Sequence, residues 1–212
     1  DIEAEGYCRK YFEEYQKMLI LINENIRNIK AILGGLKTGA VNKIFFDLGL
    51  SSGQLASTQR GFSFRYDAPL DMRMDQDSKL TAADIVNGKN KDKIEEILKE
   101  YGEEMFAGKI AEAITQYRKR SRITTTRELA GIVNDSVPGW YRRRRIHPAT
   151  KTFQALRIAV NDELGALREG LKDAVELLAQ NGRVCVLSYH SLEDRIVKKL
   201  FKETPELSML TK

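Results

Sequence analysis

The chain has 212 residues, of which 42% are hydrophobic, and its formal net charge at pH 7 is +5. This length allows one large domain or two small ones with a substantial core. Two widely separated cysteines exclude a disulfide framework and a cysteine zinc site, and no apolar run is long enough to span a membrane. We therefore expect a cytoplasmic protein with no metal and no membrane partner.

The first fifty residues predict an alternation of helices and strands. Residues 3–17 have a helical pattern, and residues 18–22 form a short apolar run typical of a strand. Isoleucines recur at helical spacing from Ile26, and the Gly34-Gly35 pair ends that helix. A second apolar strand follows at residues 43–47. Strand, helix and strand in this order predict a βαβ unit and hence a parallel sheet.

A long polar segment, residues 47–75, follows this second strand. Asp47 stands at the carboxyl end of the strand, where ligands bind in open α/β sheets, and Gly49 allows the backbone to approach a ligand. Almost thirty residues without a clear period are unusual in a compact domain and are usually functional. We therefore expect this loop to face a ligand.

Only helical patterns occur between Thr81 and about Ser136. Thr81 precedes Asp84 by three residues, and Thr125 precedes Glu128 by the same spacing, which is the pattern of a capping box. The sequence therefore predicts an all-helical insertion of residues 76–147.

The α/β pattern returns near Pro148. Apolar residues spaced by three and four from 153 to 178 predict one long helix, or two with a break near Gly165 or Gly170. Asn181-Gly182 is expected to end it, because both residues favour turns.

A further buried strand is predicted at residues 183–187, with Cys185 as a small buried hydrophobe. Residues 188–193 are its ligand-facing loop, and a helix is expected from Ile196 to Phe201.

Two loops thus leave parallel strands at one edge of the sheet, and a crevice there is the default active site. Alternatives remain for individual residues. Glu193 and Asp194 can be first-turn acids favoured by the helix dipole, His190 a structural histidine, and Asp47 a turn former. The motifs of serine hydrolases, P-loop enzymes and zinc proteases are missing from the printed sequence.

Two basic clusters flank the predicted insertion, residues 118–122 and residues 142–145, and the second follows Trp140-Tyr141. Guanidinium groups suit phosphates, and nearby aromatic rings suit unstacked bases. The clusters therefore favour nucleic-acid binding. The alternatives are solvated faces, or pairing with acids such as Glu103 and Glu104.

Four runs in the right order carry a specific resemblance: residues 47–75, 100–104, 147–164 and 187–198. They read DLGLSSGQL through RGFSFRYDAPLDMRMD, EYGEE, HPATKTFQALRIAVNDEL and LSYHSLEDRIVK. Together they resemble the RsmH (MraW) family over almost the whole chain. That family methylates the N4 amine of a cytidine in the decoding region of small-subunit (16S) ribosomal RNA, with S-adenosylmethionine as donor.

The resemblance implies an α/β fold, a Rossmann-like S-adenosylmethionine-dependent methyltransferase sheet with an all-helical inserted domain. Residues 1–75 and 148–212 would form the methyltransferase domain, incomplete at both ends, and residues 76–147 the RNA-recognition domain. Family members begin with a strand and a glycine-rich loop that hold the donor. We therefore expect the native polypeptide to extend upstream by about 40–60 residues.

The resemblance also implies roles for individual residues. Donor-binding positions are Asp1, Asn25, Ile26, Asp47 and Gln54. For methyl transfer to the N4 amine, we place the cytosine between the two loops. A backbone carbonyl or hydroxyl near Ser188 would accept an N4 hydrogen, and Asp47 or His190 would take the proton. The expected RNA-binding residues are Arg118, Arg120, Arg142, Arg143, Arg144 and Arg145.

Two other functions remain open. An N4-cytosine DNA methyltransferase usually carries a Ser/Asp-Pro-Pro-Tyr loop where this chain has Asp47-Leu48-Gly49. A non-catalytic RNA-binding assembly factor would lack the donor loop. The expected partner is small-subunit ribosomal RNA or the 30S subunit, and the oligomeric state is left open, with a homodimer as one option.

Overall fold

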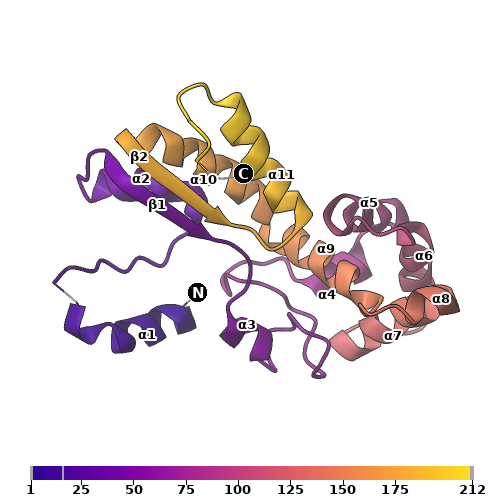
Figure 1. The fold of residues 1–212 in the computed structure, drawn as a ribbon. Helices are drawn as coiled ribbons and strands as arrows, with labels where there is room; N and C mark the ends of the chain where they lie inside the picture. Colours follow the sequence, from indigo (N-terminus) through magenta and orange to yellow (C-terminus); the bar gives the residue numbers. More distant parts are fainter. Residues whose placement is uncertain (1, 16, 211–212) are drawn as a thin grey trace. The chain divides into compact units, whose positions relative to one another are not determined.

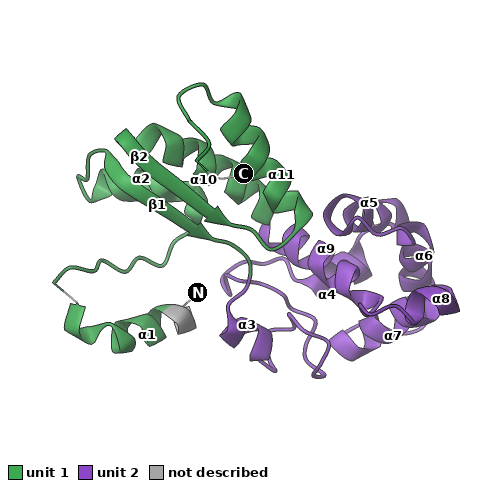
Figure 2. Ribbon diagram, viewed as in Figure 1, with its two compact units in different colours: residues 1–49, 163–212 green, residues 50–162 purple. Residues whose placement is uncertain are grey.

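A computed structural model describes residues 2–15 and 17–210 of the chain. These residues form a helix-rich α/β structure with one small parallel sheet. The chain divides into two compact units (Figure 2), which we call the sheet unit (residues 1–49 and 163–212) and the helical unit (residues 50–162). The expected α/β class is confirmed.

The sheet unit is built around two parallel strands (Figure 1). Their register runs from Lys43 opposite Arg183 to Asp47 opposite Leu187, so the parallel pairing predicted from the apolar runs is confirmed. Its elements are α1 (Ile2–Tyr11), η1 (Glu13–Tyr15), η2 (Ile26–Asn28), α2 (Ile29–Gly35), β1 (Val41–Asp47), α10 (Glu163–Leu177), β2 (Leu178–Leu187) and α11 (Ser191–Glu203).

The predicted strand at residues 18–22 is wrong, and so is the βαβ unit built on it. Met18 is 81% exposed and Ile20 is 67% exposed, and the segment has no strand assignment. A strand needs a hydrogen-bonding neighbour, and no described residue pairs with this run. The predicted helix over residues 3–17 is also shorter, since α1 ends at Tyr11.

Helices cover one face of the sheet among the described residues. Phe46 packs against Leu167 and Leu171 of α10 in the core of this unit. Alternate residues point to the opposite face. Phe45 is therefore 61% exposed, and its register partner Cys185 is exposed rather than buried as expected.

The helical unit packs its helices around one apolar core. Ile94, Leu98, Ile110, Ile114 and Leu129 are fully buried, as their spacing predicts. Its helices are α3 (Ser52–Ala56), α4 (Ala82–Gly88), α5 (Lys91–Gly102), α6 (Ala107–Tyr117), α7 (Thr126–Ser136), α8 (Gly139–Arg142) and α9 (Ala149–Asn161).

Both predicted capping boxes are present. The Thr81 hydroxyl accepts from the backbone N–H of Asp84, and the Asp84 carboxylate accepts from the backbone N–H of Thr81. Thr125 and Glu128 make the same pair of bonds at the start of α7. Each box satisfies amide groups that a helix N-terminus leaves without intrahelical partners.

Residues 57–80 have no helix or strand, yet they are packed into the helical unit rather than open as a ligand loop. The backbone N–H of Leu70 donates to Thr124 O (2.9 Å), and the side chain of Asn161 bonds both Met72 O (2.8 Å) and Met74 N (2.7 Å). Leu70 and Met72 are buried. These bonds place residues 50–75 with the helices, so the compact unit begins at 50 and ends at 162, not at 76 and 147 as expected.

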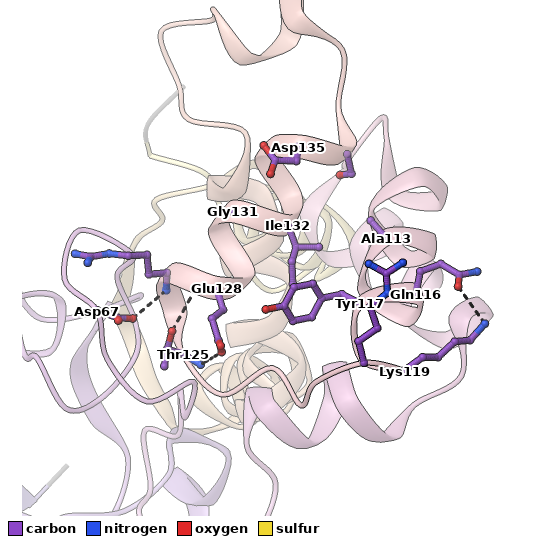
Figure 3. A pocket seen from close by; sticks show the side chains of 13 residues that line it. Asp67, Ala113, Gln116, Tyr117, Lys119, Thr125, Glu128, Gly131, Ile132 and Asp135 are labelled. Atoms are coloured by element: carbon purple, nitrogen blue, oxygen red, sulfur yellow. Dashed lines mark hydrogen bonds between the residues drawn. The ribbon is translucent and has the colours of Figure 1, made fainter.

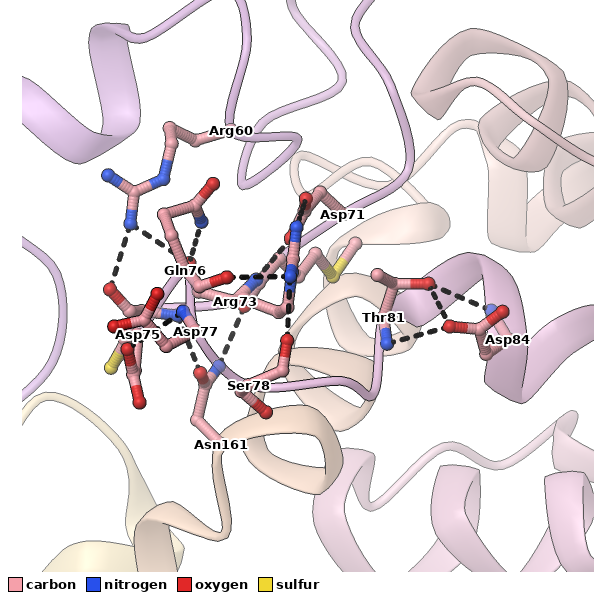
Figure 4. A network of polar contacts seen from close by, with 12 residues as sticks. Arg60, Asp71, Arg73, Asp75, Gln76, Asp77, Ser78, Thr81, Asp84 and Asn161 are labelled. Atoms are coloured by element: carbon pink, nitrogen blue, oxygen red, sulfur yellow. Dashed lines mark hydrogen bonds and ion pairs between the residues drawn. The ribbon is translucent and has the colours of Figure 1, made fainter.

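Two arginines organise this segment (Figure 4). Arg73 binds both carboxylate oxygens of Asp71 (2.8 and 2.7 Å) and donates to the carbonyls of Gln76 (2.8 Å) and Ser78 (2.6 Å). Arg60, which is 6% exposed, donates to Arg73 O and Met74 O. Partial burial would raise the pKa of Asp71, but its hydrogen bonds with Arg73 outweigh burial and hold the pKa below its ordinary value.

The break in the long predicted helix lies at Asp162, which has a left-handed φ of 47° and separates α9 from α10. Neither Gly165 nor Gly170 interrupts α10. Asn181, with a φ of 63°, lies within β2, where the register shifts opposite Val41. Asn181-Gly182 therefore marks an irregularity within β2 and does not end the preceding helix, contrary to the prediction from the sequence.

Candidate functional site

The carboxyl ends of the two strands lie together. Asp47 ends β1 opposite Leu187, which ends β2, and the next amide, Leu48 N–H, donates to Leu187 O (3.2 Å). Both strand arrows end on the same side in Figure 1. The Asp47 and Ser188 loops therefore begin side by side, as the sequence predicts for parallel strands.

Asp47 is bound to an aromatic residue of the second loop. The Tyr189 hydroxyl donates to Asp47 Oδ1 (2.8 Å), and this bond and the carboxylate charge raise the pKa of Tyr189. Gly49 has a φ of +88°, and a Cβ there would lie 3.3 Å from Tyr189 Cδ2. A side chain at position 49 would therefore press on the ring that contacts Asp47.

Sequence reasoning assigned no role to Tyr189, although it is 68% exposed beside the predicted site. The available signal was its position, the second residue after a strand whose neighbour ends in an acid. Ser188, predicted to accept an N4 hydrogen, is exposed just before it.

His190 and Glu193 are joined at the start of α11. His190 is the N-cap, and its Nδ1 accepts from the backbone N–H of Glu193 (3.4 Å). His190 Nε2 lies 3.3 Å from Glu193 Oε1, and Tyr189 N–H donates to Glu193 Oε2 (2.8 Å). Glu193 is 3% exposed. It lies in the first turn of α11, together with Asp194, as the alternative interpretation of these acids expects. The helix begins at Ser191, five residues before the expected start.

The predicted donor-binding residues lie in different places. Asn25 caps η2 by accepting a hydrogen bond from Arg27 N–H (3.1 Å). The backbone of Ile26 packs closely on Gly170 of α10, since a Cβ added to that glycine would lie 2.8 Å from Ile26 O. Gln54 belongs to the helical unit, where its side chain accepts from Ser51 N–H (2.9 Å) in a capping box. Asp1 lies outside the described residues.

Arg118 has a different environment from the one expected of an RNA contact. Its Nη1 donates to Val86 O (2.8 Å) and Lys89 O (2.6 Å), near the end of α4. The guanidinium thus satisfies carbonyls at a helix C-terminus, a structural role. The sequence does not distinguish this cation from its neighbours in the 118–122 cluster.

Arg120 lines a pocket of about 680 Å³ between α6 and α7, all within the helical unit (Figure 3). Tyr117 stands between the two helices, beside Ile132, and is 37% exposed. Lys119 and Arg127 add positive charge to the lining, and Asp67 and Asp135 add negative charge. The Glu128 carboxylate accepts three hydrogen bonds from Thr124 and Thr125. These bonds stabilise the charged carboxylate and lower the pKa of Glu128.

The arginine run 142–145 is exposed at the end of α8. Arg144 lies over the Tyr141 ring, with Cζ 5.3 Å from its centroid. Burial and the Glu104 carboxylate raise the pKa of Tyr141 to about 12. Both Glu104 oxygens accept from Tyr141 Oη (3.1 and 2.9 Å), and Oε1 also accepts from Phe106 N–H (2.9 Å).

The described residues contain no group of three or more His, Cys, Asp or Glu side chains arranged to hold a metal ion. No helix within residues 2–15 or 17–210 is long and apolar enough to cross a membrane.

Comparison with known proteins identifies the family. The model of the MraW methylase family matches residues 1–211. "Ribosomal RNA small subunit methyltransferase H" of Sulfurihydrogenibium sp. strain YO3AOP1 is 47% identical over 203 residues, covering 96% of this chain and 69% of the relative. The proteins of that name in Persephonella marina and Limosilactobacillus fermentum are 47% and 49% identical, over 97% and 89% of the chain.

The chain spans 71% of the Persephonella marina protein and 60% of the Limosilactobacillus fermentum protein. The family match covers both units and both strand ends, so the resemblance carried by the four sequence runs is confirmed. The chain belongs to the MraW methylase family and is a methyltransferase.

Proposed function

We propose that the protein transfers a methyl group from S-adenosylmethionine to the N4 amine of a cytidine in the decoding region of small-subunit ribosomal RNA. The observation that carries this proposal is the Asp47–Tyr189 pair at the carboxyl edge of the sheet, where α/β enzymes bind ligands. The relatives' printed name, a small-subunit ribosomal RNA methyltransferase, supports the substrate.

The residues at this edge fit such a donor. Asp47 is exposed and carries a carboxylate that can accept hydrogen bonds from amines or hydroxyls of S-adenosylmethionine. Gly49, two residues on, has a left-handed φ and no side chain. Asn25, Ile26, Gln54 and Asp1 remain proposed donor contacts. When bound, the donor supplies an electrophilic methyl group, so the protein itself needs no covalent chemistry.

The chain's own residues then orient the amine and remove its proton. The exposed Ser188 hydroxyl can accept one N4 hydrogen, which points the nitrogen lone pair toward the methyl group. Asp47 Oδ1 accepts from Tyr189, and Oδ2 is suited to take the N4 proton. His190 Nδ1 is engaged by Glu193 N–H, so we assign His190 to positioning the Tyr189 loop instead of proton transfer.

The target base must leave its stack before it can reach the sheet edge. We propose that the helical unit recognises the RNA around it, with Arg120 and the exposed Arg142, Arg143 and Arg145 binding phosphates. The pocket beside Tyr117 suits an unstacked base. The proposed setting is the cytoplasm, with the 30S subunit or its RNA as partner and a homodimer as one oligomeric option.

The direct test is methyl transfer from labelled S-adenosylmethionine to 16S ribosomal RNA and to 30S subunits, followed by nucleoside analysis. We expect N4-methylcytidine at one position. Methylated DNA with unlabelled RNA would favour the DNA methyltransferase alternative. RNA binding without any label would favour the non-catalytic assembly factor.

Replacing Asp47 with alanine should weaken binding of S-adenosylmethionine by about 1–3 kcal/mol, because polar groups of the ligand that become buried on binding lose their acceptor. Titration calorimetry with S-adenosylmethionine measures this, and Tyr189→Phe is the matched control, since it removes the tyrosine–aspartate bond and keeps the carboxylate. An unchanged dissociation constant for Asp47→Ala would remove Asp47 from the donor site.

Replacing Arg142, Arg143 and Arg145 together with glutamine should weaken RNA binding for all sequences alike. Phosphate contacts carry no base information, and each lost contact to a single strand flattens the slope of log K against log salt by about 0.7. Arg144 is kept because it packs on Tyr141. The measurement is RNA affinity at several salt concentrations.

The matched control replaces three exposed cations of the same unit, Arg65, Lys79 and Lys89, with glutamine. It removes the same charge away from the run. Equal effects of the two triple variants would show that only net charge matters and that the arginine run is not an RNA site.

A further inference from the structure

A second basic groove lies in the sheet unit, outside both arginine clusters of the sequence. It has a volume of about 530 Å³ between α10 and α11. Arg168 and Lys172 line it from α10, and Arg195 and Lys199 line it from α11. Its other lining residues are apolar or small, apart from one acid: Leu164, Leu192, Ile196, Leu200, Glu203 and Thr204.

Two acids of α10 pair with cations outside this groove. Glu169 pairs with Arg27 (3.8 Å), and Glu176 pairs with Lys30 (2.6 Å), both cations from the segment that packs on the other side of α10. Arg168 and Lys172 of α10 line the side that faces α11. Arg168, Lys172 and Lys199 are exposed and make no hydrogen bond or ion pair with any described residue.

The same separation of charge occurs on α11. Asp194 pairs with Lys198 (2.9 Å), and Glu193 is buried against Tyr189 and His190. Glu203 is therefore the single acid among the four cations of the lining. Like charges four residues apart on a helix repel, and here two such pairs face one groove. A bound polyanion would relieve this repulsion.

The spacing of the cations suits a ligand whose charge repeats. Residues four apart on a helix lie about 6 Å apart along its axis, so each helix presents two cations one turn apart. The apolar floor of Leu192, Ile196 and Leu200 suits sugar and base faces. A small single anion would use only part of such a lining.

The groove also begins at the candidate site. Leu192 is two residues after His190, at the start of α11, and α11 follows the carboxyl end of β2 directly. The groove and the Asp47–Tyr189 edge are therefore joined by the first turn of α11.

We propose that the α10–α11 groove binds the phosphate backbone of single-stranded ribosomal RNA next to the target nucleotide. The inference rests on the proposed function, since it takes the substrate to be RNA. It adds a second contact surface, in the unit that carries the catalytic edge.

The test compares two triple variants of the full chain. The groove variant is Arg168→Gln, Lys172→Gln, Lys199→Gln, and the control variant is Lys10→Gln, Lys37→Gln, Lys202→Gln, exposed cations of the same unit outside the groove. Both lose three positive charges. The probes are a 12-residue oligouridylate and 16S ribosomal RNA, with affinity measured from 50 to 300 mM salt.

We expect the groove variant to bind both probes roughly 100-fold more weakly at 0.1 M salt, with a slope of log K against log salt flatter by about 2. The control variant should stay within about twofold of wild type. Glu203→Gln should bind more tightly than wild type, because it removes the one acid of the lining. Equal losses in the groove and control variants would overturn the proposal.

Two further measurements separate this proposal from the proposed function. If wild-type protein methylates 16S ribosomal RNA while the groove and control variants bind RNA equally, the groove inference fails alone. If wild type neither binds nor methylates the RNA, the proposed function itself fails. Normal binding of naked RNA by the groove variant, with loss of methylation only on 30S subunits, would assign the groove to a ribosomal protein and overturn the RNA proposal.

Discussion

Replacing Gly61 with alanine is expected to unfold the helical unit or lower its free energy of unfolding by about 3–5 kcal/mol. Gly61 has a φ of +70°, which a side chain disfavours. A Cβ there would lie 2.2 Å from Pro69 O and 2.9 Å from Asp71 N, both backbone atoms that cannot move alone. Urea denaturation followed by circular dichroism measures the loss.

The matched control is Gly131→Ala in the same unit. Gly131 lies inside α7, and a Cβ there meets nothing within 4 Å, so alanine should stabilise the helix by about 0.5–1 kcal/mol. If Gly61→Ala were as stable as wild type, the close approach of Gly61 to the Pro69–Asp71 backbone would be wrong.

Replacing Arg73 with methionine should cost about 2–4 kcal/mol, the second largest effect that we expect. The substitution removes four hydrogen bonds, and it leaves the Asp71 carboxylate, whose side chain is 18% exposed, without its cation. Arg73→Lys should recover only part of this, because an ammonium group cannot bind the carboxylate and two carbonyls in one plane.

Arg65→Gln, an exposed arginine of the same segment, is the control and should stay within about 0.5 kcal/mol of wild type. A loss for Arg73→Met no larger than that of Arg65→Gln would show that the network in Figure 4 does not stabilise the unit.

The stabilisation from this pair should depend on pH in one direction. The pKa of Asp71 is lower in the folded chain than its ordinary value, so its contribution is present above about pH 4 and is lost as pH falls through the folded pKa. The difference in unfolding free energy between wild type and Asp71→Asn should therefore shrink in acid. A difference that grows in acid would contradict the lowered pKa.

Local patterns were sufficient for the parts of the chain whose partners are close in sequence. Thr81 and Thr125 predicted their capping boxes because the bonded residues lie three apart. The apolar runs ending at Asp47 and Leu187 predicted two parallel strands with adjacent carboxyl ends. The four family runs likewise predicted the family, since each is a continuous stretch of sequence and their order along the chain needs no structure.

Residues whose partners are distant in the sequence have contacts that local patterns do not predict. Arg118 binds carbonyls of residues 86 and 89, and Asn161 binds residues 72 and 74, so their roles exist only once the helical unit has folded. The polar loop after Asp47 was expected to face a ligand, whereas Arg60 and Arg73 tie much of it into a packed unit.

The candidate site was likewise predictable only in part from the sequence. Sequence alone placed Asp47, Ser188 and His190 at one sheet edge, because parallel strands bring their carboxyl ends together. It did not reveal that Tyr189 binds Asp47 across 142 positions or that Glu193 engages His190. The α10–α11 groove likewise depends on which face of each helix is covered. Spacing along one helix predicts neighbours on that helix, but only the tertiary packing decides which charges of two helices meet.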